Sequence, residues 1–246
     1  MSRVKHSHTS FPRNVTRDSS SPFALVHSDI WGPSRVKSTL GFQYFVTFID
    51  DYSRCTCLFL MKNRSELFHT FQYFFNEIKT QFGVSIRVLH RDNGCEYLSY
   101  SFKQFMTSHG ILYQTFCAYT PQQNGVAECK NIHLIETTRT LLIHGEVSEH
   151  FWGDAILTTC YLINRMSSTI LKNNIPHSIL FPHEPLHPLP LRVFGSTCFV
   201  HNFSPGLDKL SPRSHKCVFL EFTRSQKGYK CFSPFLNRYF VSTDHL

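Results

Sequence analysis

The spacing of apolar residues between positions 23 and 144 constrains the fold of this chain more than any other feature. Three strand-like runs come first, at residues 23–30, 42–49 and 55–61. The last two flank a polar turn and therefore predict a β-hairpin. From Asn63 the apolar residues recur every three or four positions, which predicts an amphipathic helix that ends at Gly83. Asn63 and Glu66 form a capping-box pattern at its start.

Further elements follow in an order that defines the fold class. A strand is predicted at residues 86–90, a short helix around residues 102–106 and a second strand at residues 111–116. Two longer helices are predicted at residues 126–144 and 149–165. This order predicts an α/β domain over residues 23–171, with a mixed sheet flanked by helices. Residues 172–190 contain five prolines and predict an extended connector rather than a helix. Short strand-like runs over residues 191–246 predict a small all-β, barrel-like domain.

The composition indicates a folded protein with a polyanionic partner. Hydrophobic residues make up 41% of the 246 residues and charged residues only 17%, so the chain has ample material for a core. The exception is the polar, basic segment 1–22, which we interpret as a flexible lead-in. The net charge of +8 favours nucleic acid as a partner, because Lys and Arg displace counterions from phosphates. A merely basic protein is the alternative, since the basic residues are spread along the chain.

The cysteines and the apolar runs indicate where in the cell the protein is found. The nine cysteines are scattered and form no CxxC pair, so we interpret them as reduced thiols rather than as a zinc or redox site. No apolar run approaches the roughly 20 residues that span a bilayer, and the first residues lack a signal-peptide pattern. We therefore expect an intracellular protein that does not bind a membrane.

Three acidic residues stand where predicted elements end or begin. Asp29 ends the first strand, Asp92 lies just beyond the fourth, and Glu128 lies in the first turns of the long helix. Glu128 shares a stripe with Ile135 and Leu142 at seven-residue steps, so we expect it to face the sheet. We therefore predict that the three carboxylates converge on one cleft.

Such a cluster has a chemical reason to exist. Three carboxylates repel one another unless divalent cations neutralise them. Two Mg²⁺ or Mn²⁺ ions about 3.5–4 Å apart can activate an attacking oxygen, stabilise the leaving one and hold a phosphodiester in line. The pattern therefore indicates two metal ions per site and phosphodiester chemistry. Taken singly, each carboxylate is more commonly a solvated cap or turn residue. The chemistry alone would also fit other metal-dependent nucleases.

The segments around these residues narrow the choice. They are residues 27–33 (HSDIWGP), 48–54 (FIDDYSR), 92–97 (DNGCEY) and 119–128 (YTPQQNGVAE). In this order they resemble the integrase core of copia-type long-terminal-repeat retrotransposons, and later segments extend the resemblance to the C-terminus. The resemblance implies an RNase H-like fold in which Asp29, Asp92 and Glu128 are catalytic and bind two metal ions. It also implies trimming of the 3′ ends of element DNA, strand transfer into target DNA, action in the nucleus, a homo-oligomer and no organic cofactor.

Other residues near this predicted site are candidate DNA contacts. They are Gln122, Gln123 and Asn124 in the loop before Glu128, and Lys130 and Arg139 in the helix after it. Amide and cationic side chains contact phosphates or bases, and the alternatives are an ordinary loop and solvated cations.

Histidines and further acidic residues near the site are assigned supporting roles. His27 and His90 each precede a predicted catalytic Asp by two positions and so point to the same face of a strand. Because Mg²⁺ prefers oxygen ligands, we interpret them, with Asn93, as hydrogen-bonding neighbours of the carboxylates. Three acidic residues are interpreted as turn or loop supports outside the metal site: Asp50, Asp51 and Glu96.

The chain departs from the resembling family at a few positions. Cys129 stands where Arg is usual, and Cys95 and Glu221 stand where Gly is usual. Residues 1–22 resemble only the linker that follows a zinc-binding module in the family, so we expect that module to be missing. An active enzyme is the leading interpretation. A catalytically inert relic that still folds and binds nucleic acid, and a domesticated interaction protein, are the alternatives, and a Mg²⁺- or Mn²⁺-dependent nicking assay would separate them.

Overall fold

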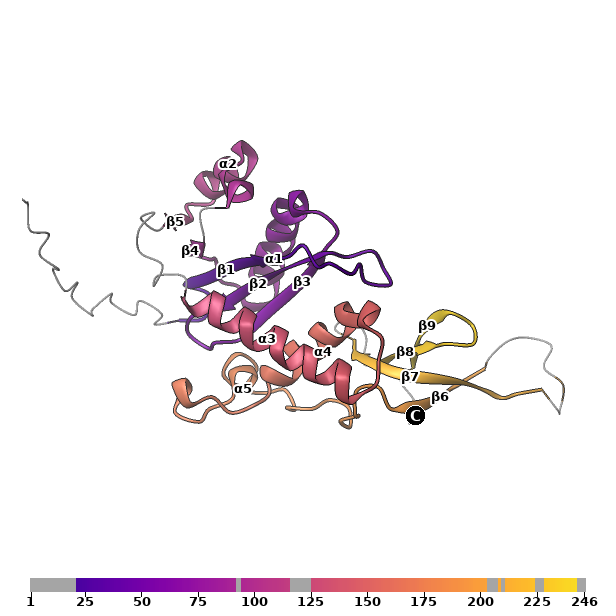
Figure 1. The fold of residues 1–246 in the computed structure, drawn as a ribbon. Coiled ribbons are helices and arrows are strands. Elements are labelled where there is room, and N and C mark those ends of the chain that lie inside the picture. Colours follow the sequence, from indigo (N-terminus) through magenta and orange to yellow (C-terminus); the bar gives the residue numbers. More distant parts are fainter. Residues whose placement is uncertain are drawn as a thin grey trace, which may run out of the picture.

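The computed structural model describes residues 21–91, 94–115, 125–202, 208, 211–223 and 228–242. Within them the first part of the chain forms a five-stranded sheet in the order β3-β2-β1-β4-β5 (Figure 1). Its strands are β1 (Leu25–Trp31), β2 (Tyr44–Asp50), β3 (Thr56–Met61), β4 (Val88–Arg91) and β5 (Leu112–Thr115). Strands β1 to β3 pair antiparallel, whereas β4 pairs parallel with β1 and β5 pairs parallel with β4. The predicted mixed sheet and its β-hairpin are confirmed.

Helices cover both faces of this sheet (Figure 1). On one face lie α1 (Leu67–Phe82) and α2 (Tyr100–Ser108), and on the other lie α3 (Gly125–His144) and α4 (Trp152–Ile163). Short 3-10 helices precede three of them: η1 (Arg64–Glu66), η2 (Cys95–Leu98) and η4 (Glu149–Phe151). None of the helices in the described part of the chain combines the length and the apolar character needed to cross a membrane.

The predicted boundaries of the first helix are confirmed by its caps. The Glu66 carboxylate accepts a hydrogen bond from the Asn63 backbone N–H at 3.1 Å, which is one half of the capping box. At the other end, Gly83 has a φ of 64°, in the left-handed region that favours glycine, and its N–H donates to the Lys79 carbonyl oxygen. Local sequence therefore sets both ends of the helix.

Phenylalanine rings fill the layer between the sheet and α1. Phe48 of β2 stacks on Phe74 of α1 with ring centroids 4.5 Å apart, and Phe71 of α1 lies 5.0 Å from Phe102 of α2. All four side chains are fully buried, and each contributes about 2–3 kcal/mol through the apolar area that it removes from water. The spacing of three and four residues in the sequence thus marks the buried face of α1.

The proline-rich segment after α4 is not extended throughout. The short helix α5 (Pro176–Leu180) forms within it, after the 3-10 helix η5 (Thr169–Leu171). Pro176 occupies the first turn of α5, where a backbone N–H has no partner within the helix in any case. Leu180 is buried in the same core cluster as α1. The prediction of an extended connector is therefore wrong over these residues.

The second sheet is antiparallel and has the strand order β6-β7-β8-β9. Its strands are β6 (Thr197–His201), β7 (Ser214–Phe222), β8 (Tyr229–Ser233) and β9 (Arg238–Ser242). The predicted small all-β domain is confirmed. Strand β7 packs against α4, so this sheet lies directly on the α/β domain (Figure 1).

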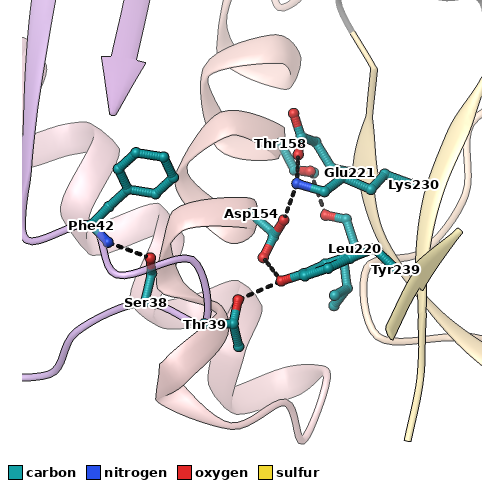
Figure 2. Close-up of polar contacts among 9 residues, drawn as sticks. All are labelled: Ser38, Thr39, Phe42, Asp154, Thr158, Leu220, Glu221, Lys230 and Tyr239. Carbon is teal, nitrogen blue, oxygen red and sulfur yellow. Dashed lines mark hydrogen bonds and ion pairs between the residues drawn. The ribbon is translucent and has the colours of Figure 1, made fainter. Parts of the chain in front are cut away.

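A polar cluster joins the two domains (Figure 2). Lys230 Nζ of β8 lies 2.6 Å from Asp154 Oδ1 of α4 and 2.9 Å from Glu221 Oε2 of β7. The Tyr239 hydroxyl of β9 donates to Asp154 Oδ2 at 2.8 Å and lies 2.5 Å from Thr39 Oγ1. Glu221, one of the departures from the resembling family, is therefore part of the domain interface.

The charges in this cluster are matched only in part, because one ammonium serves two carboxylates. Burial raises the pKa of Glu221, and the nearby Asp154 adds to this effect, against the attraction of Lys230. Burial alone would lower the pKa of Lys230, but Glu221 and Asp154 together outweigh burial and raise it. Lys230 is therefore held in its charged form between the two domains.

Candidate active site

Asp29 lies on the face of β1 that α3 covers, and two elements hold its carboxylate. Oδ2 accepts a hydrogen bond from Asn131 Nδ2 of α3 at 2.9 Å, and Oδ1 accepts one from the Ile30 backbone N–H at 2.9 Å. Asn131 is buried, and its Oδ1 accepts a hydrogen bond from Thr47 Oγ1 of β2 at 2.9 Å. Thr47 is the cross-strand partner of Asp29 in the sheet. The linked side chains of Thr47 and Asn131 therefore orient Asp29 relative to α3.

Glu128 lies near the start of α3, three residues before Asn131. Side chains three positions apart are neighbours on a helix surface, with Cβ atoms about 5–6 Å apart, so Glu128 stands beside the residue that holds Asp29. Its side chain is exposed. The fully buried stripe of α3 consists of Ala127, Asn131, Leu134 and Thr138. Ile135 and Leu142, which share a stripe with Glu128, are partly buried and pack against the core cluster that includes Phe45 and Leu58 of the sheet. The direction of the Glu128 side chain itself stays a prediction.

Asp92 and Asn93 lie outside the described residues, as do Gln122, Gln123 and Asn124. The described part of β4 ends at Arg91, whose Cα pairs with that of Ser28 in β1. Asp29 directly follows Ser28 in the sequence, and Asp92 directly follows Arg91. Among the residues that the structure describes, no group of three or more His, Cys, Asp or Glu side chains is arranged to hold a metal ion.

The two predicted histidines lie side by side on neighbouring strands. His27 and His90 are paired in the parallel ladder of β1 and β4, with ring centroids 5.1 Å apart and the rings edge to face. His27 Nε2 lies 3.0 Å from Asp51 Oδ1, which also pairs with Arg54 Nη2 at 2.8 Å. Asp51 is therefore engaged by His27 and Arg54, in agreement with its assignment as a structural residue.

Asp50 and Glu96 support the backbone and a loop, as predicted. Asp50 Oδ1 accepts a hydrogen bond from the Phe23 N–H at 2.7 Å, and Oδ2 accepts one from the Ser53 hydroxyl at 2.6 Å. Burial raises the pKa of Asp50. Glu96 pairs with Arg64 Nη1 at 3.1 Å, which ties η2 to η1.

The cationic candidates differ in exposure. Arg139 is exposed on α3, whereas Lys130 is half-buried and burial lowers its pKa. Cys129, which stands where the resembling family has Arg, is exposed. Of the two predicted cationic contacts, Arg139 is therefore the one whose charge faces solvent.

Asn131 was not predicted from the sequence, although a polar residue within the buried stripe of α3 is a usable signal. Replacing Asn131 with Ala removes a hydrogen-bond partner from both Asp29 and Thr47. We expect the free energy of unfolding to fall by about 1–3 kcal/mol, because buried polar groups lose hydrogen-bond partners. Any metal-dependent activity should fall about 10–100-fold, with a higher metal concentration at half-maximal rate. Thr140→Ala, at an exposed position of the same helix, is the control, and equal rates and metal dependence for the two variants would contradict a positioning role for Asn131.

Comparisons with known proteins agree with this architecture. A model of the integrase core domain matches residues 19–121, and a model of the retroviral polymerase SH3-like domain matches residues 196–245. A chain in the structure of the simian T-cell lymphotropic virus intasome, solved with the PP2A regulatory subunit B56 gamma, has a TM-score of 0.53 at 18% identity. The match covers 89% of this chain and 76% of that chain. This protein therefore carries an integrase core domain followed by a retroviral SH3-like domain.

Its relatives are copia-type Pol polyproteins of plant transposons. The chain is 36% identical over 220 residues to the retrovirus-related Pol polyprotein from transposon TNT 1-94 of Nicotiana tabacum, covering 89% of this chain and 16% of that protein. It is 33% identical over 227 residues to the polyprotein from transposon RE1 of Arabidopsis thaliana, covering 92% of this chain and 15% of that protein. It thus spans about a sixth of the length of these relatives. The resemblance found in the sequence is confirmed.

Proposed function

We propose that this protein catalyses the metal-dependent cleavage and strand transfer by which element DNA is integrated into target DNA. The observation that carries this proposal is the hydrogen bond from Asn131 of α3 to the Asp29 carboxylate, because Glu128 lies three positions before Asn131 on the same helix. Asp92, directly after the neighbouring strand β4, completes the proposed set from the sequence. The integrase core domain and the transposon relatives support DNA integration as the process.

The donor set suits Mg²⁺ or Mn²⁺. Both hydrogen bonds described above for Asp29 are donated by neutral N–H groups, from Asn131 and from the backbone of Ile30. Asp29, Asp92 and Glu128 would offer only oxygen ligands, which these ions prefer. A metal pair held by these three residues would supply activation of the attacking oxygen and stabilisation of the leaving oxygen.

The reaction proceeds in two steps, a hydrolysis and then a transesterification. In end trimming, the oxygen of water attacks a phosphorus atom, the bond to the 3′ oxygen breaks, and a free 3′-OH remains. In strand transfer, that 3′-OH attacks a phosphorus atom of target DNA, and the target strand leaves with its own 3′-OH. The chain contributes orientation, since Asn131 fixes Asp29, and charge, since Arg139 faces solvent on the same helix as Glu128. We also propose that several copies assemble on two DNA ends in the nucleus, because paired insertion requires both ends to be held at once.

The test is an assay of the purified chain on labelled terminal duplexes with Mg²⁺, Mn²⁺ or EDTA. We expect single-strand cleavage and joining with either metal, and none with EDTA. Cleavage that persists in EDTA would contradict the metal-dependent mechanism. DNA binding without any product under all three conditions would favour the inert relic.

A further inference from the structure

A groove of about 420 Å³ lies between α3 and the edge of the core next to α4. Its α3 wall includes Ile135, Arg139 and Leu142, which recur at steps of three and four residues and so share one helix face. The facing wall includes Trp31 of β1 and Trp152 of α4. The groove is therefore built by the same strand and the same helix that carry Asp29 and Glu128.

Both walls belong to elements that also carry residues of the candidate active site. Trp31 follows Asp29 by two positions in β1, so the two side chains point to the same face about 7 Å apart along the strand. Ile135 follows Glu128 by seven positions, two turns or about 10 Å along the same stripe of α3. The stripe that the sequence predicted to face the sheet thus forms a wall of this groove.

The aromatic rings of the groove are fixed in place. Trp31 is half-buried and stacks on Phe45, with ring centroids 5.1 Å apart and ring planes 22° apart. Trp152 meets Trp31 edge-on at 5.9 Å, and its indole N–H donates to the Val36 carbonyl oxygen at 2.9 Å. Fixed aromatic surfaces bind nucleobases of any sequence, because every base has a π face to stack.

Two of the exposed residues that line the groove are basic. Arg35 and Arg139 are exposed at the groove. Glu149, the acidic residue in the groove lining, lies beyond the C-terminal end of α3, whereas Glu128 lies near its N-terminal end. The loop that carries Arg35 depends on Gly32, which has a φ of 125° and whose added Cβ would lie 2.7 Å from the Gln43 carbonyl oxygen. Only glycine therefore allows the chain to turn here and place Arg35 over the groove.

We propose that this groove binds an unpaired nucleotide of the DNA strand next to the scissile phosphodiester. Its base stacks against the Trp31 side of the groove, and its phosphate contacts Arg35 or Arg139. A groove of this size takes single bases rather than a duplex, so the nucleotide is one that has separated from its partner strand. This inference rests on the proposed function, because the nucleotide belongs to the DNA that Asp29 and Glu128 act on.

Intrinsic fluorescence provides a direct test, because both tryptophans of the chain, Trp31 and Trp152, line the groove. The full chain is titrated in EDTA, which prevents cleavage, with a duplex that has a short single-stranded tail. A gel-shift measurement gives the total affinity in parallel. We expect quenching by the tailed duplex, retained in Trp152→Phe, where Trp31 is the sole reporter. A tail with abasic sites should bind about tenfold more weakly and quench less.

Variants of the residues that line the groove test whether the fluorescence change comes from DNA bound in the groove. Trp31→Ala should weaken binding of the tailed duplex about tenfold, and Trp31→Phe, which keeps a ring, should restore most of the loss. Arg139→Gln should lower affinity and reduce the slope of log affinity against log salt by about 1. Tyr100→Ala is the control, because this ring is 79% exposed on α2, across the sheet from the groove. If Trp31→Ala fails to fold, Arg139→Gln and the abasic tail on the unmodified chain decide the question.

The outcomes separate this inference from the proposed function. Binding of tailed DNA without quenching, and unchanged by abasic sites, would overturn the groove assignment and leave the proposed function intact. Absence of any DNA binding would overturn both. A change in fluorescence with protein concentration alone would assign the groove to a second copy of the chain and also overturn the inference.

Discussion

Replacing Glu128 with Gln is expected to lower metal-dependent DNA cleavage about 10³-fold, while DNA affinity stays equal or rises slightly. Glu128 is proposed to help hold the metal ions that stabilise charge in the transition state, and the loss of one such stabilising contribution lowers a rate by about 10²–10³. Affinity does not fall, because the change removes a negative charge from a surface that faces phosphates. Glu128 is exposed, so the loss of rate would not reflect unfolding. Asp92→Asn is expected to behave in the same way.

The measurement pairs a cleavage assay with DNA binding at several salt concentrations. Affinity should fall steeply with salt for the unmodified chain and for both variants, because binding releases counterions. Glu136→Gln is the matched control, since Glu136 is an exposed glutamate on the same helix. Full cleavage activity in Glu128→Gln would remove Glu128 from the proposed site.

The local sequence predicted the ends of the helices better than it predicted which side of each helix is buried. The capping box at Asn63 and the left-handed Gly83 act within a few residues, and both ends of α1 were predictable from them. The seven-residue stripe of Ile135 and Leu142 was predicted to face the sheet, and both side chains pack partly buried against the same core cluster as Leu134. The fully buried stripe that contains Leu134 and Asn131 was not predicted. Neighbouring stripes of one helix have similar spacing, so only packing selects the one that is fully buried.

Contacts between distant segments explain the other differences. Helix α5 forms in a proline-rich segment because Leu180 joins the core beside α1 and Phe181 packs on Phe82, with ring centroids 5.3 Å apart. Asn131 acquires its role only because α3 crosses β1 and β2. Glu221 was interpreted as a departure from a family pattern, yet its partner Lys230 stands on the next strand and Asp154 lies on α4. The spacing of residues in the local sequence does not reveal contacts between such distant residues.

Replacing Lys230 with Met is expected to lower the free energy of unfolding by about 3–5 kcal/mol. The change leaves Asp154 and Glu221 buried without their shared cation, and removing one partner of a buried ion pair is costly in this range. Because the cluster lies between α4 and the second sheet, the loss should also loosen the two domains (Figure 2). Urea unfolding and limited proteolysis of the full chain measure the two effects. Lys216→Met is the matched control, since Lys216 is exposed on β7.

The pH dependence of this loss identifies its cause. Without Lys230, the pKa of the buried Glu221 in the folded state should rise further above its unfolded value, because burial raises it and the attraction of Lys230 is lost. The folded variant then binds more protons than the unfolded chain above about pH 4.5, so its stability falls as pH rises. The deficit relative to the unmodified chain should therefore be smaller at pH 5 than at pH 8. Adding Glu221→Gln to Lys230→Met should recover part of the loss, because one buried charge is removed. A deficit that is independent of pH and unaffected by Glu221→Gln would show that Lys230 stabilises the interface through the packing of its aliphatic stem instead.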